Sequence, residues 1–260
     1  MQQEKFWKQE TKQKEMFLND LETYIPQIEI ELKKILKEKI NFELTNGIKT
    51  EEFLREDLAF DLENLKQAEN SKFLEFENLD ENEILEKLKN KSLDDLIDLQ
   101  IDVSLTKKIL AEIEFLKLCN QKVNSNIQEV YFDLDETLVS HVNNYNKPRQ
   151  SIDFIRPAAR IILEKLKEKG IKIGILTTRE KKYIPQEIKK FVNAKIIDRN
   201  SGIEYKEKCF QKYGSEKTPY DDKACFAKLA KPNLMIVDDA PYAKEYKNCV
   251  FVSDEAKFLL

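Results

Sequence analysis

Two aspartates, Asp133 and Asp135, follow directly after residues 130–132, which favour a β-strand. Because successive strand side chains point to opposite faces, both carboxylates can converge on one point while Leu134 packs away from it. Carboxylates this close repel each other unless a cation or a shared proton relieves the repulsion. The pattern fits a magnesium-dependent phosphoryl-transfer site. Asx turns at strand ends use the same residue types, so this segment alone leaves both interpretations open.

Two more predicted strands of the chain end in polar side chains. The strand at 171–176 is followed by Thr177, and the strand at 234–237 is followed by Asp238 and Asp239. Ligands of parallel α/β sheets bind beyond the carboxyl ends of the strands. If the sheet is parallel, these side chains and Asp133 meet at one edge, and the joint pattern favours a catalytic site over a set of unrelated turns and caps.

The sequence lacks the residues that several other enzyme classes require. The four cysteines are widely spaced without a C-x-x-C pair, which argues against a zinc site or a disulfide framework. Neither Cys119 nor Cys209 is followed by the arginine-closed loop of a cysteine-dependent phosphatase. His141 is the only histidine, so a serine or cysteine triad would depend on that one residue. Five glycines in total cannot supply a glycine-rich nucleotide loop.

Composition predicts a cytoplasmic protein of one or two domains. The chain has 260 residues, of which 35% are charged, and no apolar run is long enough to span a membrane. The charged N-terminal sequence MQQEKFWKQETKQKE lacks the apolar core of a signal peptide. A protein exported without a cleaved apolar signal would also lack this apolar core, so that route stays open.

The chain changes character near residue 125. Residues 1–125 contain one of the five glycines and one of the seven prolines, and 28 acidic against 19 basic residues give them a net charge of −9. Residues 126–260 carry 20 acidic and 25 basic residues, a net charge of +5. We therefore predict two domains, 1–125 and 126–260.

Residues 1–125 are predicted to be an all-α domain. Apolar residues recur at helical spacing over 28–40, 53–65, 84–88 and 105–116, and Thr50 and Ser104 are expected to cap two of these helices. The acidic residues are predicted to form a solvated helical face, with a surface for a basic partner as the alternative. The domain contains no catalytic pattern, and we expect a role in targeting, protein interaction or oligomerisation.

Residues 126–260 alternate strands with helices, which predicts a Rossmann-like parallel sheet with right-handed crossovers. Pro157 is placed to open a helix and Gly170 to end it. An irregular polar segment is expected at 198–222, and a terminal helix capped by Asp254. The predicted strands are 130–132, 171–176, 194–197, 234–237 and 250–252, and the other predicted helices are 185–192, 223–230 and 241–247.

The sequence DLDETL at 133–138, Thr177, a downstream lysine and VDDAP at 237–241 resemble the motifs of haloacid-dehalogenase-like phosphatases. Arg156-Pro157 and a Tyr-x-x-Lys before a helix further resemble the branch that includes the RNA polymerase II carboxy-terminal-domain phosphatases. Glu136 points to the same branch, because the related phosphomutases tend to have glycine there. The resemblance covers about residues 127–255 and does not extend to residues 1–125.

The resemblance implies a mechanism. Asp133 would be the nucleophile that forms an aspartyl phosphate, and Asp135 would protonate the leaving oxygen and then activate water. Thr177 would bind a phosphoryl oxygen. The cofactor would be Mg²⁺, held by Asp133, the backbone carbonyl of Asp135, and the pair Asp238 and Asp239. Within this pair, Asp239 is the preferred metal contact.

The phosphate-binding lysine has two candidates. Lys223 stands 15 residues before Asp238 and follows Tyr220 in the Tyr-x-x-Lys pattern, so we favour it, with Lys217 as the alternative. Thr178 is a candidate substrate contact whose simpler role is a helix cap. Three arginines are further candidates for substrate contact: Arg149, Arg179 and Arg199.

The sequence predicts a phosphatase acting on a phosphorylated protein or peptide. About 18 residues separate Thr137 from Arg156, too few for a separate cap domain, and an open site suits a macromolecular phosphate. The segment SHVNNYNKPRQ departs from the branch, so polymerase-tail specificity does not carry over. One alternative is a small-molecule or nucleic-acid-end phosphatase. A second is a helical binding protein with an inactive phosphatase-fold scaffold. No nucleic-acid partner is predicted.

Overall fold

The computed structural model describes residues 21–65, 71–123, 126–143 and 151–260. They divide into two compact units. The sheet unit comprises Leu110–His141, Asp153–Leu259 and the described part of Met1–Ile25; the helical unit comprises Pro26–Ile109, the described part of Val142–Ile152, and Leu260. The division falls inside helix α5 (Leu93–Lys122). A cut between independently folding domains at residues 125 and 126 therefore stays a prediction.

The sheet unit contains a five-stranded sheet in the order β5-β4-β1-β6-β7, and every neighbouring pair is parallel. The strands are β1 (Glu129–Phe132), β4 (Lys172–Leu176), β5 (Ile196–Ile197), β6 (Leu234–Asp238) and β7 (Cys249–Phe251). Phe132 lies opposite Ile175 of β4 and Val237 of β6. The register therefore ends these three strands side by side, and the predicted α/β class with a parallel sheet is confirmed.

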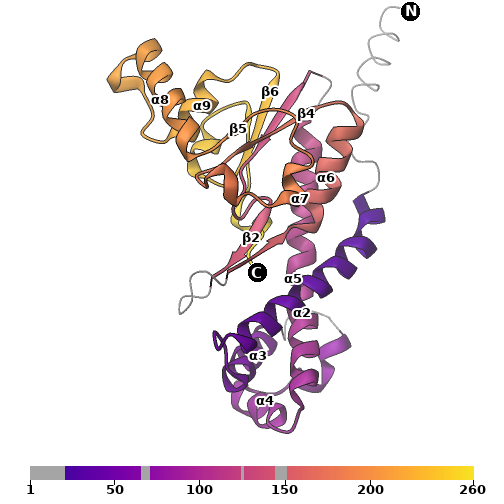
Figure 1. The fold of residues 1–260 in the computed structure, drawn as a ribbon. Coiled ribbons are helices and arrows are strands. Elements are labelled where there is room, and N and C mark those ends of the chain that lie inside the picture. Colours follow the sequence, from indigo (N-terminus) through magenta and orange to yellow (C-terminus); the bar gives the residue numbers. More distant parts are fainter. Residues whose placement is uncertain (1–20, 66–70, 124–125, 144–150) are drawn as a thin grey trace, which may run out of the picture. The chain divides into compact units, whose positions relative to one another are not determined.

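Helices cover both faces of this sheet, with α8 and α9 on one side and α6 on the other (Figure 1). Tyr131 packs in the cluster that includes Phe226 of α9, whereas its neighbours Val130 and Phe132 point to the opposite face. The helices are α6 (Pro157–Glu168), α7 (Gln186–Lys189), α8 (Arg199–Tyr213) and α9 (Asp222–Leu229). Short 3₁₀ helices are η3 (Lys181–Tyr183), η4 (Ser215–Lys217), η5 (Pro241–Lys244) and η6 (Asp254–Ala256).

Of three local predictions for the sheet unit, the structure confirms the first and contradicts the other two. Pro157 opens α6, and Gly170 follows that helix with a φ of 70°, as predicted. The prediction of an irregular segment at 198–222 is wrong for most of its length, since it contains the 15-residue helix α8. A capping box between Asp198 and Ser201 stabilises the start of this helix. The predicted cap Asp254 is wrong: it is the first residue of η6, and no side-chain hydrogen bond caps that turn.

A two-stranded sheet of β2 (Val139–Val142) and β3 (Ile152–Ile155) lies in sequence between β1 and α6. These are the two elements that the described residues form there. The expectation that this stretch is too short for a cap domain stays a prediction, because residues 144–150 lie outside the described residues.

The helical unit is built from α2 (Ile25–Thr45), α3 (Glu51–Leu65), η2 (Ser71–Phe76), α4 (Glu81–Leu88) and the first part of α5, and η1 (Leu21–Tyr24) precedes α2. Thr50 accepts a hydrogen bond from the Phe53 N–H at 3.1 Å, which confirms the predicted cap. Ser104 lies inside α5, so its predicted capping role is wrong. The helix starts eleven residues earlier, where Ser92 accepts a hydrogen bond from the Asp95 N–H.

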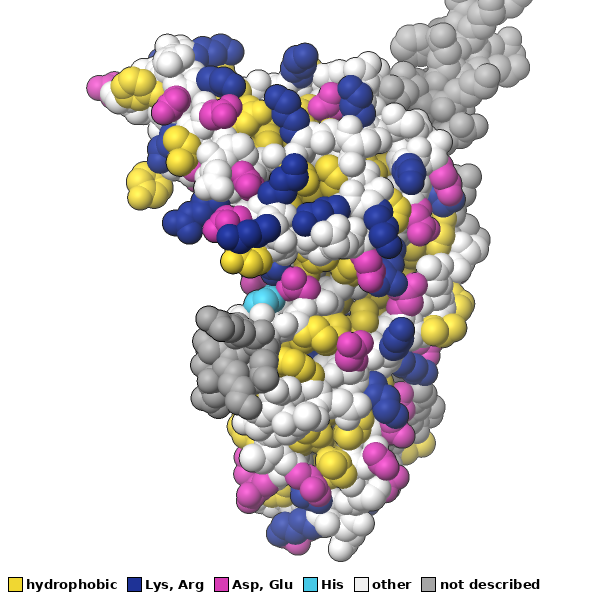
Figure 2. All heavy atoms as spheres, in the orientation of Figure 1, with side chains coloured by type: hydrophobic (Ala, Val, Ile, Leu, Met, Phe, Trp, Pro, Cys, Tyr) yellow, Lys and Arg dark blue, Asp and Glu magenta, His cyan; other side chains and the backbone are white. Residues whose placement is uncertain are grey.

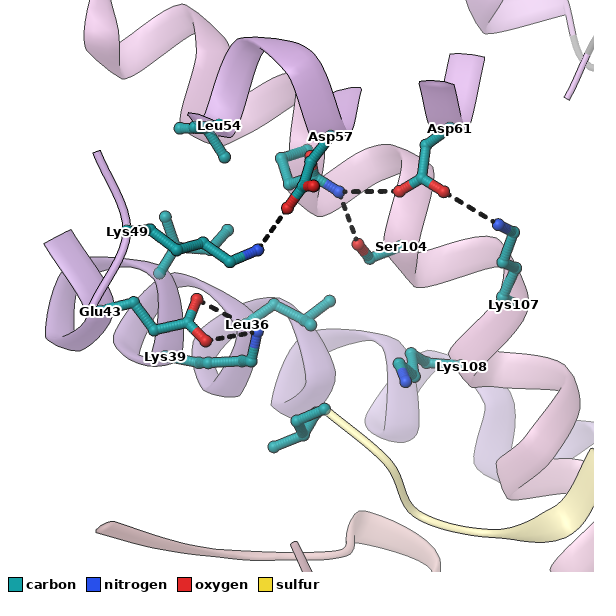
Figure 3. A pocket seen from close by; sticks show the side chains of 13 residues that line it. Leu36, Lys39, Glu43, Lys49, Leu54, Asp57, Asp61, Ser104, Lys107 and Lys108 are labelled. Atoms are coloured by element: carbon teal, nitrogen blue, oxygen red, sulfur yellow. Dashed lines mark hydrogen bonds and ion pairs between the residues drawn. The ribbon is translucent and has the colours of Figure 1, made fainter. Parts of the chain in front are cut away.

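A pocket of ≈ 250 Å³ in the helical unit shows that its acidic residues are not all on a solvated face. Figure 3 shows three lysine–carboxylate pairs along its wall: Lys39–Glu43, Lys49–Asp57 and Lys107–Asp61. Glu43 is buried, contrary to the prediction, and the Lys39 ammonium 3.0 Å away balances its charge. Pairing within the pocket wall explains how these carboxylates are accommodated.

Candidate active site

Asp133 is the first residue after β1 and is buried, with 4% of its surface exposed. Its N–H donates to the Val237 carbonyl at 2.8 Å, which continues the sheet by one residue and fixes the start of the loop. The chain then turns tightly, since the Glu136 N–H donates to the Val139 carbonyl and Glu136 has a φ of 60°. This left-handed conformation favours glycine, so Glu136 is held there by the surrounding contacts.

Lys223 lies in the first turn of α9, and its ammonium reaches the centre of the site. Its Nζ lies 2.7 Å from Asp133 Oδ1 and 3.3 Å from Asp238 Oδ2. Lys217 ends η4, where its carbonyl accepts a hydrogen bond from Lys228. The structure therefore brings Lys223 to Asp133, and it does not bring Lys217 there.

Asp238 and Asp239, at the end of β6, have different surroundings. Asp238 is fully buried, and both of its oxygens are engaged: Oδ1 accepts from the Ala240 N–H at 2.8 Å and Oδ2 accepts from the Tyr242 hydroxyl at 2.6 Å. Asp239 is only partly buried and pairs with Lys257 at 3.2 Å. Asp239 thus retains more capacity for a metal, while Asp238 is placed to orient Lys223.

Asp133, Asp238 and Asp239 form the one group of potential ligands that the described residues bring together for a metal ion. One oxygen of each lies within 4.8 Å of the others. Such a set of oxygen donors suits Mg²⁺, and a divalent cation would add to the positive charge that Lys223 and Lys257 bring to the three carboxylates. The predicted ligand Asp135 is outside this group as a carboxylate, because its side chain points to Arg179.

Burial dominates the electrostatics of Asp133. It raises the pKa of Asp133 to about 8; Lys223 opposes this shift and Asp238 adds to it. Burial alone would lower the pKa of Lys223, but the charges of Asp133 and Asp238 raise it above its ordinary value. Lys223 therefore carries a positive charge, and near neutral pH additional positive charge at the site would favour the ionised form of Asp133.

Thr177 and Thr178 follow β4, beside Asp133. Thr177 is buried and its Oγ1 accepts from the Arg179 N–H at 3.1 Å, which leaves its hydroxyl proton able to donate. Both threonines and Lys223 line a pocket of ≈ 330 Å³, together with Asp198, Arg199, Gly202, Lys206, Tyr220, Asp221, Asp222 and two apolar residues. The pocket offers room for a substrate group next to the site. Arg149 lies outside the described residues.

Arg179 holds the side chain of Asp135. From the sequence, Arg179 was one of three arginines that were candidates for substrate contact. Arg179 Nε donates to Asp135 Oδ2 at 3.1 Å, and Nη2 contacts the other carboxylate oxygen. Arg179 Nη1 also donates to Asp153 Oδ2 at 2.9 Å, and His141 Nδ1 lies 2.6 Å from Asp153 Oδ1. His141, Asp153, Arg179 and Asp135 therefore form a chain of four interacting side chains, with Asp135 at one end.

Tyr242, Lys257 and Asp153 were missed from the sequence. Tyr242 had a usable signal, because it follows Asp238-Asp239 by three residues at the expected start of a helix. Lys257 and Asp153 had none, since each reaches the site only through the fold and lies in a segment without a motif. Lys257 lies within 3.5 Å of carboxylates from three residues, Glu136, Asp239 and Asp254.

The parallel sheet, with Asp133 directly after its central strand and Lys223, Asp238 and Asp239 around it, is consistent with a haloacid-dehalogenase-like fold. Residues 130–254 match the family model of the NLI interacting factor-like phosphatases. The family is one of haloacid-dehalogenase-like carboxy-terminal-domain phosphatases, which confirms the resemblance stated for this segment. Neither the curated proteins nor the solved structures contain a match to the chain. In the described part of the chain, no helix has the length and apolar character needed to cross a bilayer.

The two lysine candidates give a direct test of the site. We expect Lys223→Ala to lower kcat for phosphate-monoester hydrolysis by about a hundredfold or more, because a charged hydrogen-bond donor at the phosphate is lost from a buried site. Lys217→Ala is the matched control and should keep at least about half of the activity. Steady-state kinetics on a small aryl phosphate measure both, and a larger loss for Lys217→Ala would reverse the assignment.

Proposed function

We propose that this protein is a Mg²⁺-dependent phosphatase that hydrolyses phosphate monoesters through an aspartyl phosphate on Asp133. The observation that carries the proposal is the position of Lys223, whose Nζ lies 2.7 Å from Asp133 and 3.3 Å from Asp238. A nucleophile must be ionised to attack, yet burial raises the pKa of Asp133 to about 8. Lys223 and a cation bound at Asp133 and Asp239 would together favour the ionised form.

The roles follow from the contacts. Asp133 attacks phosphorus in line, Lys223 and the Thr177 hydroxyl bind phosphoryl oxygens, and Asp135 passes a proton from the substrate monoanion to the leaving oxygen. Asp238 keeps Lys223 in place through Oδ2, which Tyr242 orients from the other side. When bound, Mg²⁺ supplies charge neutralisation at the phosphate, and Asp133, Asp239 and the Asp135 backbone would hold it. Water then releases phosphate, with Asp135 as the base.

We infer that the substrate is a phosphorylated protein or peptide. The pocket beside Thr177 is lined by Tyr220, which is 94% exposed, and by the basic residues Arg199 and Lys206. Exposed aromatic and basic side chains suit an extended polypeptide better than an enclosed metabolite. In the view of Figure 2, basic side chains are spread over the sheet unit with acidic ones between them. The net charge of +5 over residues 126–260 is thus distributed and does not form one patch in this view.

A substrate panel tests this proposal. We expect phosphopeptides to be hydrolysed with a higher kcat/KM than nucleotides, sugar phosphates and nucleic-acid 5′ or 3′ ends, and EDTA to stop every reaction. Comparing phosphoserine, phosphothreonine and phosphotyrosine peptides of one sequence then identifies the residue type. A preference for a small metabolite would replace the substrate class while retaining the chemistry. Activity that survives EDTA would overturn the metal-dependent mechanism.

Metal binding should depend on pH in a way that the raised pKa of Asp133 determines. Protons and Mg²⁺ compete for this carboxylate, and below about pH 8 the metal-free form retains its proton. We therefore expect the rise in Tm caused by a fixed Mg²⁺ concentration to grow between pH 6 and pH 9. Differential scanning fluorimetry measures the shift. Asp133→Asn should lose most of the pH dependence, and a shift that shrinks with pH would contradict the prediction.

A further inference from the structure

Among the described residues, Arg179 contacts the carboxylate of Asp135 through two guanidinium nitrogens. It follows Thr177 and Thr178 at the end of β4, so its backbone is fixed beside the sheet edge, and its own N–H donates to Thr177 Oγ1. Nε and Nη2 take one oxygen each of Asp135, and the Arg179 side chain is only 16% exposed. A two-pronged contact of this kind fixes both the position and the plane of a carboxylate.

The remaining guanidinium nitrogen is anchored on the two-stranded sheet. Nη1 donates to Asp153 Oδ2 at 2.9 Å, and Asp153 Oδ1 lies 2.6 Å from His141 Nδ1. His141 is on β2 and Asp153 on β3, so neighbouring strands hold the far end of the guanidinium while Asp135 takes the near end. The Arg179 side chain thus spans from the short sheet to the loop that carries Asp135.

We propose that Arg179, held by Asp153, is a positioning residue that aims the carboxyl group of Asp135 at the leaving oxygen of the substrate. The inference rests on the proposed function and adds a residue that the motif pattern does not contain. Asp135 sits in a loop with 40% of its side chain exposed, so without a partner it would sample several rotamers. Arg179 removes that freedom before substrate binds, which reduces the entropy lost on reaching the transition state.

The step that depends on this placement is the departure of the alcohol. As the bond from Asp133 oxygen to phosphorus forms, the bond from phosphorus to the ester oxygen breaks and its electron pair stays on that oxygen. Asp135 is a carboxylate while Arg179 contacts both its oxygens, so a phosphate monoester that binds as its monoanion brings the proton. Asp135 accepts this proton, passes it to the ester oxygen and is left as a carboxylate again. Phenols of low pKa leave without the proton, whereas serine and other alkyl alcohols require it. Misplacing Asp135 should therefore slow esters with poor leaving groups far more than activated aryl esters.

The experiment measures kcat and KM for p-nitrophenyl phosphate, phenyl phosphate and a phosphoserine peptide with Arg179→Lys, which keeps the charge and loses the fork. We expect kcat for the peptide to fall by about 10- to 100-fold, part of the full contribution of a general acid, with KM changed less than about threefold. The loss on p-nitrophenyl phosphate should be several times smaller. Asp153→Asn, one contact further away, should show the same leaving-group dependence with a smaller loss.

A double-mutant cycle separates positioning from a structural role. If Arg179 acts through Asp135, adding Arg179→Lys to Asp135→Asn should lower kcat for the peptide no further than Asp135→Asn alone. Equal losses on all three esters, or losses that multiply in the double variant, would overturn the inference. Arg160→Lys is the control: Arg160 pairs with Glu187 at the surface, and it should show no leaving-group dependence.

The proposed function and this inference fail in distinguishable ways. A wild-type protein that hydrolyses none of the three esters in Mg²⁺ overturns both. An active wild type with an Arg179→Lys variant that loses activity uniformly overturns the positioning role alone. Far-UV circular dichroism and Tm of each variant show whether a loss follows from unfolding, and Asp153→Asn keeps the test decisive if Arg179→Lys folds poorly.

Discussion

Asp133→Asn is expected to abolish Mg²⁺-dependent release of phosphate, with kcat reduced by at least about 10³-fold. The substitution removes the attacking oxygen anion and leaves the size of the side chain nearly unchanged. Turnover of p-nitrophenyl phosphate measures the loss. Trapping of radioactive phosphate on the protein after acid quench should give a signal for the wild type and none for the variant.

The fold should survive this substitution, which makes the activity loss interpretable. Burial raises the pKa of Asp133 to about 8, so the ionised carboxylate is an unfavourable group in the metal-free fold. A neutral asparagine should therefore leave the metal-free Tm unchanged or raise it. Asp94→Asn, at an exposed position of α5, is the matched control and should retain full activity. Undiminished turnover by Asp133→Asn would contradict the covalent mechanism.

The sheet and its catalytic edge follow from local signals. Apolar runs of three to six residues ending in polar side chains locate β1, β4 and β6, and Pro157 and Gly170 delimit α6. Parallel order then places the ends of these strands side by side without knowledge of any distance. Asp133, Thr177 and Asp238 could be grouped from the sequence for this reason, and Lys223 could be preferred to Lys217.

What the sequence does not reveal is the pairing of charges across long separations. Arg179 and Asp135 are 44 residues apart, and Arg179 and Asp153 are 26 apart. A charged side chain near a strand end has the same appearance whether it faces solvent or a buried partner. Helix α8 was missed for a different reason. Its polar sequence buries only Gly202 and Cys209, so it carries no amphipathic period, and its start depends on the cap at Asp198.

Arg156 is the largest side chain among the fully buried residues that the structure describes, and from the sequence it appeared only in the pair Arg156-Pro157 before a helix, with no buried partner assigned to it. Its Nε donates to Glu112 Oε1 at 2.8 Å, and its other nitrogens donate to three backbone carbonyls. The guanidinium also stacks on Phe115, with 3.9 Å between its carbon and the ring centroid. Glu112 was expected on a solvated helical face, yet it is buried and also accepts from the Ala158 N–H at 2.7 Å.

Arg156→Met should lower the free energy of unfolding of the sheet unit by about 3–5 kcal/mol, because Glu112 is left as a buried charge without its partner. Denaturant titration followed by circular dichroism measures the change. The control is Arg160→Met, which breaks an exposed pair with Glu187 and should cost less than about 1 kcal/mol. A loss of less than about 1 kcal/mol for Arg156→Met would show that water reaches Glu112.

The double variant Arg156→Met with Glu112→Leu separates the cost of an unpaired charge from the value of the ion pair itself. With both charges removed, no buried ion remains, and we expect the double variant to be more stable than Arg156→Met alone. Full recovery is not expected, since the Ala158 N–H and three carbonyls lose their partners. A double variant less stable than Arg156→Met would mean that the hydrogen bond from the Ala158 N–H to Glu112 outweighs the cost of leaving Glu112 as an unpaired buried charge. Glu112 would then stabilise the start of α6 chiefly as a hydrogen-bond acceptor.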